Sequence, residues 1–248
     1  MKKYILTLIL ALASLGLYAQ TNRNKTIINA ALHGWEYEIK AGVNLGGTAP
    51  LPFPEEIRSI DGYNPTLSIT IEGNMTKWLD TKKKWGIITG LRLENKGMRT
   101  KATVKNYNME IIGYDGNRLK GNWTGGVRTK VQNSYITIPV LAAYKLSPRT
   151  TLKLGPYFSY LMDGDFSGHV YEGYLRETNP TGDKINFTNG AIATYDFSGD
   201  LRKFQWGVQA GVDWKAFKHL KVHADLNWGL NDIFNKDFKT VTFDMYAI

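Results

Sequence analysis

Two neighbouring segments late in the chain, 204–214 and 220–230, alternate apolar and polar residues along their whole length. Successive side chains on a β-strand point to opposite faces, so each segment would have one apolar and one polar face. A half-buried strand of a soluble protein keeps this pattern for about five or six residues, whereas a strand that crosses a bilayer needs about nine to eleven. Trp206, Trp214 and Trp228 stand toward the ends of the apolar stripes, where a membrane interface favours amphipathic rings. The two segments therefore predict a hairpin of membrane-spanning strands.

The first residues have the features of an export signal. Two lysines precede an apolar stretch over residues 5–17, and small Ala19 is followed by a polar segment. An uncleaved membrane helix is the alternative, but it would need roughly twenty apolar residues. The flanks favour a signal peptide over residues 1–19, cleaved after Ala19. We therefore expect a short periplasmic segment over 20–34 and one outer-membrane β-barrel domain over 35–248.

Composition excludes several classes of protein. The chain has no cysteine, so it has neither a disulfide framework nor thiol ligands for a metal. Its net charge of +9 could suit nucleic acid, but an exported chain rich in strands, Trp and Tyr argues against that partner. Most basic residues fall in predicted turns and connections. Solvated surface charge explains them most simply, and attraction to lipopolysaccharide phosphates or another acidic ligand is the alternative.

The same alternation recurs along the chain and predicts eight antiparallel strands. They lie at 37–45, 67–78, 85–94, 136–144, 151–162, 204–214, 220–230 and 239–248. The pattern indicates an all-β fold, an eight-stranded up-and-down transmembrane barrel.

The connections between these strands support the same fold. They are short after the second, fourth and sixth strands, and long elsewhere, notably over 96–133 and 163–202. Short turns at one rim and long loops at the other are typical of outer-membrane barrels. We expect these two long loops to project outward and to carry any recognition of an extracellular or envelope protein or glycan.

Six short motifs, in order along most of the chain, resemble one known family. They are Ala41-Gly-Val-Asn-Leu45, Gly90-Leu-Arg-Leu-Glu-Asn-Lys-Gly97, Tyr135-Ile-Thr-Ile-Pro-Val140, Leu154-Gly-Pro-Tyr-Phe-Ser-Tyr160, Trp206-Gly-Val-Gln-Ala-Gly-Val212 and Leu226-Asn-Trp-Gly-Leu-Asn-Asp232. The chain resembles the Bacteroidota outer-membrane β-barrel family often labelled PorT-like or porin-family. This resemblance implies an eight-stranded barrel in the outer membrane, and it supplies no active-site motif. Such barrels usually end on an aromatic residue read by the barrel-assembly machinery, whereas this chain ends on Ile248.

Several charged residues should point into the barrel lumen. By the alternation these are Glu36, Glu38, Lys40, Arg92 and Glu94. Eight strands leave an interior just wide enough for side chains, so we expect a salt-bridge network that fills the lumen rather than a diffusion pore.

A second inward group offers the best candidate for chemistry. His223 and Asp225 share one face of a strand, and Gln209 and Asp213 would lie across the hairpin from them. They could bind a metal or form an acid–base pair, but a hydrogen-bonded polar lumen is the simpler interpretation. We therefore assign no catalytic, cofactor-binding or metal-binding residues.

The sequence thus predicts a structural or binding protein of the outer membrane that works through its outer loops. Its partners would be outer-membrane lipid, lipopolysaccharide, the barrel-assembly machinery during biogenesis, and a ligand bound by the loops 96–133 and 163–202. Two alternatives stay open. A lipid A- or phospholipid-modifying enzyme would need a Ser/His/acid group at the rim. A soluble periplasmic barrel of the lipocalin type would have its apolar residues inside.

Overall fold

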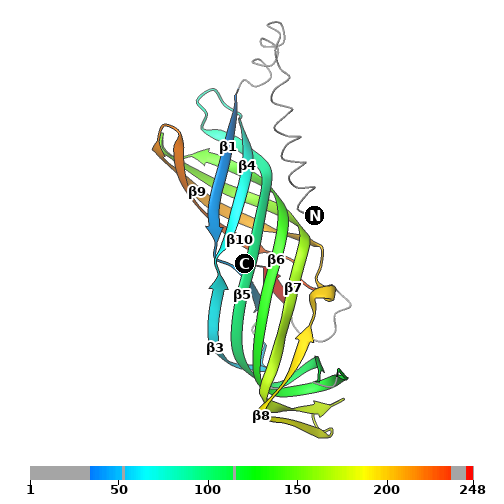
Figure 1. Ribbon diagram of the computed structural model, residues 1–248. Helices are drawn as coiled ribbons and strands as arrows, with labels where there is room; N and C mark the ends of the chain where they lie inside the picture. The colour runs from blue at the N-terminus through cyan, green and yellow to red at the C-terminus, as the bar shows by residue number, and fades with distance from the viewer. Residues whose placement is uncertain (1–33, 52–53, 114–115, 236–243, 248) are drawn as a thin grey trace, which may run out of the picture. The chain divides into compact units, whose positions relative to one another are not determined.

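The computed structural model describes residues 34–51, 54–113, 116–235 and 244–247, and nearly all of them lie in strands (Figure 1). Nine strands form one antiparallel sheet, and two short strands form a second sheet. The large sheet contains β1 (Trp35–Asn44), β3 (Ile57–Thr66), β4 (Ser68–Trp78), β5 (Trp85–Ile112), β6 (Arg118–Lys145), β7 (Thr150–Glu177), β8 (Lys184–Asp196), β9 (Phe204–Phe217) and β10 (Leu220–Gly229). The small sheet pairs β2 (Thr48–Leu51) with β11 (Asp244–Ala247). No helix among the described residues is long and apolar enough to span a membrane.

Seven of the eight predicted strands are confirmed, and they follow one another in the order β1-β4-β5-β6-β7-β9-β10. The hairpin of β9 and β10 is in register from Trp214↔Val222 to Gly207↔Gly229, so its apolar residues share one face as predicted. The signal peptide and nearly all of the periplasmic segment predicted over 20–34 fall outside the described residues.

The sheet curls until its first and last strands meet. Lys221 Nζ of β10 lies 3.1 Å from Glu38 Oε2 of β1, and Lys40 Nζ of β1 lies 3.4 Å from Asp213 Oδ1 of β9. Among the described residues the order of strand pairing ends at β1 and β10. Side chains of opposite charge therefore join the two edges across this seam.

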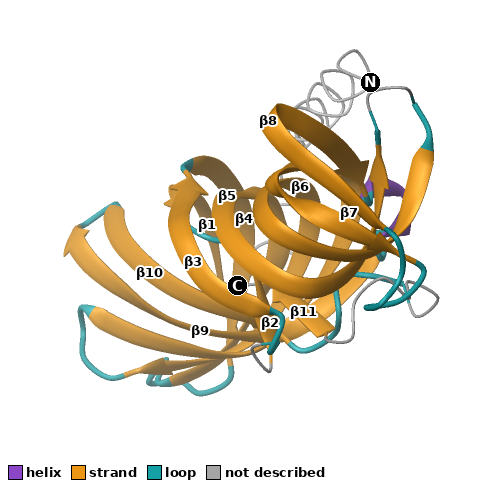
Figure 2. Cartoon of the chain, turned by 90° about the horizontal axis from the view of Figure 1, so that it is seen from below, coloured by secondary structure: helices purple, strands orange, loops and turns teal. Residues whose placement is uncertain are grey.

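The predicted eighth strand, 239–248, does not take the place expected for it. Its described part, β11, pairs with β2 instead of completing the large sheet between β10 and β1. Figure 2 shows these two strands side by side, enclosed by the curved sheet. Met245 and Ala247 are buried there, so the burial of apolar side chains favours this position.

The prediction of projecting loops at 96–133 and 163–202 is wrong for most of both segments. β5, β6 and β7 each run for 28 residues, and β8 pairs with β7 over much of the second segment. β3 adds a further strand to this region by pairing with β5 between Thr66↔Gly97 and Ile57↔Val104. These strands persist because apolar and polar residues still alternate, with Met98 and Val104 inside and Lys101 outside.

Candidate functional site

The half of the sheet near the short turns is apolar outside and polar inside. Ile39, Ile69 and Leu226 are 86%, 68% and 63% exposed, whereas Thr137 and Gln209 are completely buried. A soluble lipocalin-like barrel would show the reverse arrangement. Exposed apolar side chains around a polar interior are the pattern of a barrel that faces lipid.

Aromatic residues mark the two borders of this apolar surface. At the short-turn border, the tilted rings of Trp85 and Tyr144 have their centroids 4.5 Å apart, and Trp214 lies on β9. At the other border, strand register aligns Leu93, Ile136, Tyr160 and Phe204 in one row. Phe204 and Trp214 are ten positions apart on β9. With tilted strands this separation gives a band roughly 23–27 Å tall, which matches the ~25 Å apolar band of outer-membrane barrels.

Within the band, Arg92 is the centre of a buried polar network. Its guanidinium lies 3.3 Å from Glu72 Oε2 and 3.4 Å from Glu94 Oε2, and it donates a hydrogen bond to Gln209 Oε1 at 3.2 Å. The hydroxyl of Thr137 donates to Glu94 Oε1 at 2.7 Å. The inward direction predicted for Arg92 and Glu94 is confirmed.

A second network surrounds Lys153. Its ammonium lies 2.6 Å from Asp213 Oδ1 and 2.8 Å from Asp225 Oδ1, and Lys40 also reaches Asp213. The side chain of Lys153 is completely buried. Sequence patterning missed Lys153 because its two partners lie on other strands, 60 and more positions away.

The pairing of β9 with β10 brings together the four candidate residues of the lumen, Gln209, Asp213, His223 and Asp225. His223 stands opposite Asp213 in the β9–β10 register, and Asn227 stands opposite Gln209. Asp213 and Asp225 are both held by Lys153, however, so an ammonium occupies the position where a metal would have to bind. The described residues contain no cluster of His, Asp and Glu suited to a metal ion.

Beyond the row of Leu93, Ile136, Tyr160 and Phe204, the interior changes from polar to apolar. We call this part, formed by β2, β3, β8, β11 and the far halves of β5–β7, the distal compartment. Its interior is a continuous apolar core that includes Trp123, Val170 and Leu175, all completely buried. Trp123 packs edge-to-face on Phe187, with ring centroids 5.4 Å apart. Phe187, which falls in the second predicted loop, thus belongs to a folded interior.

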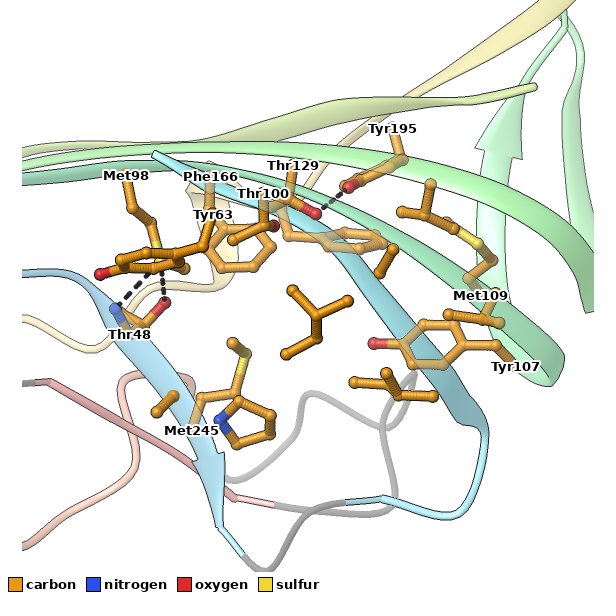
Figure 3. A pocket seen from close by; sticks show the side chains of 18 of the residues that line it. Thr48, Tyr63, Met98, Thr100, Tyr107, Met109, Thr129, Phe166, Tyr195 and Met245 are labelled. Carbon is orange, nitrogen blue, oxygen red and sulfur yellow. Dashed lines mark hydrogen bonds between the residues drawn. The ribbon is translucent and has the colours of Figure 1, made fainter. Parts of the chain in front are cut away.

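The distal compartment contains a chamber of about 270 Å³ (Figure 3). Its walls come from β2, β3, β5, β6, β7, β8 and β11, and its lining is mainly aromatic, aliphatic and methionine side chains. The lining includes Ile60, Tyr63, Met98, Ala102, Met109 and Met245. Ile60 and Tyr63 are each 54% exposed, so the chamber is accessible at β3. The alternation that continues through 98–104 could have indicated this inner apolar face.

The outer face of the same strands is basic. Lys101 of β5, Arg128 of β6 and His169 of β7 stand directly opposite one another, and Arg99 stands opposite Lys130. Lys101 Nζ and Arg128 Cζ lie 5.7 and 5.2 Å from the ring centroid of Tyr171. Partial burial and the charge of Arg128 lower the pKa of His169. We call Arg99, Lys101, Arg128 and Lys130 the basic wall; together with neighbouring residues they line a hollow of about 910 Å³.

Like charges directly opposite one another on paired strands are destabilising, so the basic wall needs compensation. Asp165 provides part of it, because its Oδ2 lies 2.7 Å from Lys130 Nζ. Asp61 lies near Lys101, and the hydrogen bonds of Ser59 and Thr103 together with that charge lower its pKa. Lys101 and Arg128 both lie over the ring of Tyr171, which stabilises their charges. Only glycine fits at position 126 beneath this ring, because a Cβ there would collide with it.

Comparison with known proteins adds one finding to this geometry. A family model described as outer membrane protein beta-barrel domain matches residues 18–235. Neither the curated proteins nor the solved structures yield a match. The matched region spans β1 to β10 and therefore all of the lipid-facing strands. The chain is thus a protein of the outer membrane and belongs to the family of outer membrane protein beta-barrel domains.

Proposed function

We propose that this protein is a non-conducting, binding member of its family that recognises a ligand or partner with the distal compartment at the cell surface. The signal-like N-terminus supports export, and the six motifs support a place among the PorT-like barrels of Bacteroidota. In outer-membrane barrels the short turns face the periplasm, which places the distal compartment outside the cell.

One observation carries this proposal. β5, β6 and β7 continue well past the lipid-facing band and enclose an apolar chamber of their own. A protein that served only as a membrane anchor or a pore would have no need of a second folded interior outside the bilayer. Binding residues are commonly held on rigid scaffolds in this way.

The filled lumen leads to the first prediction. Arg92, Lys153 and Gln209 are each 3% exposed or less, and they lie across the middle of the barrel. In planar bilayers we expect the purified protein to give no reproducible conductance steps, because these buried side chains occupy the narrow interior enclosed by the seven lipid-facing strands. Heat-unfolded protein is the control for leakage caused by disordered chains. Stable steps of one size from folded protein would contradict a filled lumen.

The alternative of a lipid-modifying enzyme meets an obstacle in the hydrogen bonding at the rim. Ser167 and His169 share the outer face of β7, which is the kind of position such an enzyme would use. The hydroxyl of Ser167 is hydrogen-bonded to Asp165, whose pKa is lowered, against the opposing effect of burial, by its hydrogen bonds with Lys130 and Ser167. A nucleophilic serine instead needs a bond to its general base. The arrangement favours binding over catalysis.

The basic wall leads to a second prediction, on lipopolysaccharide as a partner. Phosphate groups attract clustered cations, and the attraction falls as salt rises. We expect the double variant Lys101→Glu/Arg128→Glu to bind purified lipopolysaccharide at least about tenfold more weakly than the parent at low ionic strength. Binding would be measured by surface plasmon resonance over a salt series.

The matched control is Lys82→Glu/Lys83→Glu, which makes the same change of charge at exposed positions in the tight turn at the opposite rim. It should bind like the parent. If both double variants lose the same affinity for lipopolysaccharide, net charge alone attracts it. If neither variant loses affinity, the basic wall does not bind lipopolysaccharide.

A further inference from the structure

We propose that the chamber binds a single uncharged alkyl chain of about ten carbon atoms, which enters at β3. The inference rests on the proposed function, since it names the class of ligand that the distal compartment would recognise.

The chemistry of the lining excludes a charged or strongly polar occupant. None of the described residues that line the chamber carries a charge. Two of its hydroxyl groups are hydrogen-bonded within the protein: Thr129 Oγ1 and Tyr195 Oη lie 2.6 Å apart, and Tyr195 also donates to the carbonyl of Arg128 at 3.1 Å. Thr48 is directed at the sulfur of Met98, with its backbone nitrogen 3.4 Å away (Figure 3). A carboxylate or phosphate placed here would lose its water without gaining a partner.

The kind of side chain in the lining fits a flexible hydrocarbon. Met98, Met109 and Met245 contribute three thioethers, and these unbranched side chains adapt to irregular apolar ligands. Aromatic rings of Phe166 and Tyr107 complete opposite parts of the wall (Figure 3). This combination supplies dispersion contacts in all directions and no fixed polar anchor.

The volume sets the length of the chain. An apolar cavity of about 150 Å³ stays dry and takes a benzene ring of six carbons. At 270 Å³ the chamber is nearly twice as large, which scales to about ten carbon atoms. A chain of sixteen carbons would have to leave part of its length outside.

The entrance is at β3. Ile60 and Tyr63 line the chamber and yet remain half exposed, although they lie beyond the lipid-facing band. Half-exposed apolar side chains at the mouth of an apolar chamber leave hydrocarbon in contact with water, and an alkyl chain would remove that contact. The cations of the basic wall lie on the other face of β5 and β6, so they do not reach the bound chain.

The chain contains natural probes for the test. Met98, Met109 and Met245 line the chamber, whereas Met75 and Met162 are 39% and 51% exposed elsewhere on the sheet. Protein labelled with ¹³C at the methionine methyl groups would be placed in lipid nanodiscs and titrated with hexanol, decanol, hexadecanol and decanoate. We expect saturable shifts of the three chamber methyl signals, strongest with decanol, and no saturable shift of Met75 or Met162. Parallel shifts of all five signals would mean simple partition into the lipid and would overturn the proposal, as would equal binding of decanoate.

Two pairs of variants give an independent check. Ala102→Phe fills the chamber, and its control Ala142→Phe makes the same change at an exposed position on β6. Ile60→Lys puts a charge at the half-exposed entrance, and Ser59→Lys puts one at the neighbouring exposed position. Ile60→Lys should weaken decanol binding at least about tenfold, since an apolar site rejects charge, while Ser59→Lys should leave it nearly unchanged. This exposed pair decides the question even if Ala102→Phe does not fold, and equal affinity in both would overturn the proposal.

The alkyl chain could come from a membrane lipid or from a free molecule outside the cell. Nuclear Overhauser effects between lipid acyl protons and the chamber methyl groups, before any alcohol is added, would identify a lipid as the source. Their absence together with decanol binding would identify a free molecule. If no alkyl chain binds while Lys101→Glu/Arg128→Glu still loses lipopolysaccharide, this inference fails and the proposed function stands.

Discussion

Replacing Arg92 by methionine should lower the free energy of unfolding by about 3–5 kcal/mol, because it leaves buried carboxylates without their cation. Glu72 and Glu94 lie within 3.4 Å of the guanidinium, and their side chains are 6% and 1% exposed. The measurement is urea-induced unfolding in lipid vesicles, followed by tryptophan fluorescence and by the gel mobility of the folded barrel.

A partly exposed ion pair provides the control. Lys221 and Glu38 form a 3.1 Å pair with side chains 37% and 21% exposed, so Lys221→Met should cost less than about 1 kcal/mol. The double variant Glu72→Gln/Arg92→Met should recover much of the loss, since it removes the buried Glu72 charge together with Arg92 and leaves Glu94 beside the buried cation Lys96. If Arg92→Met and Lys221→Met cost the same, the lumen is hydrated and the filled-barrel account is wrong.

Arginine at position 210 should cost about 2–4 kcal/mol, the penalty for a cation at the midplane of a lipid-facing strand. Ala210 is exposed, and it lies on β9 about midway between Trp206 and Trp214. The measurement is again equilibrium unfolding in lipid vesicles.

Leu220→Arg is the matched comparison, because Leu220 is exposed at the end of β10 beside the turn. Near the interface the same substitution should cost about 0–1 kcal/mol. Equal costs at both positions would show that the surface around Ala210 faces water.

Local periodicity was sufficient to predict the lipid-facing strands. The observed register from Trp214↔Val222 onward keeps the apolar residues of 204–214 and 220–230 on one face, as the alternation predicts. A one-residue slip would turn Gln209 toward lipid, so this register is strongly favoured. The inward positions of Lys40, Arg92 and Glu94 follow from the same period and are confirmed by their burial.

The distal strands were predicted as loops although they pair as hairpins, β5 with β6 beside Ile112↔Arg118 and β7 with β8 beside Arg176↔Lys184. Charged residues and glycines interrupt the hydrophobic pattern of β5 and β6, and the ladder contains register shifts at Val104/Tyr107 and Gly125/Gly126. Period-two patterning does not reveal a bulge, which adds a residue to one strand only. β2 gives no local signal, and its pairing with β11 joins positions nearly 200 apart.

The lumen partners were missed because they lie far apart in the sequence. The contact between Arg92 and Gln209 joins positions 117 apart in sequence, and the curl of the whole sheet creates it. Sequence pattern predicts which face a residue occupies, but the pairing across a lumen depends on how strongly the sheet curves. Lys153 was therefore unassigned, although its strand was predicted.

The most direct test of the central claim is quenching by lipid along β9. The chain has no native cysteine, so single cysteines at positions 206, 208, 210 and 212 can each carry a fluorophore in folded protein. Bilayers made with lipids brominated along the acyl chain should quench the fluorophore at all four positions, most strongly at 208 and 210, and aqueous iodide should quench it weakly there. Strong iodide quenching at 210 with no effect of the brominated lipids would contradict a membrane-spanning barrel and would favour a soluble one.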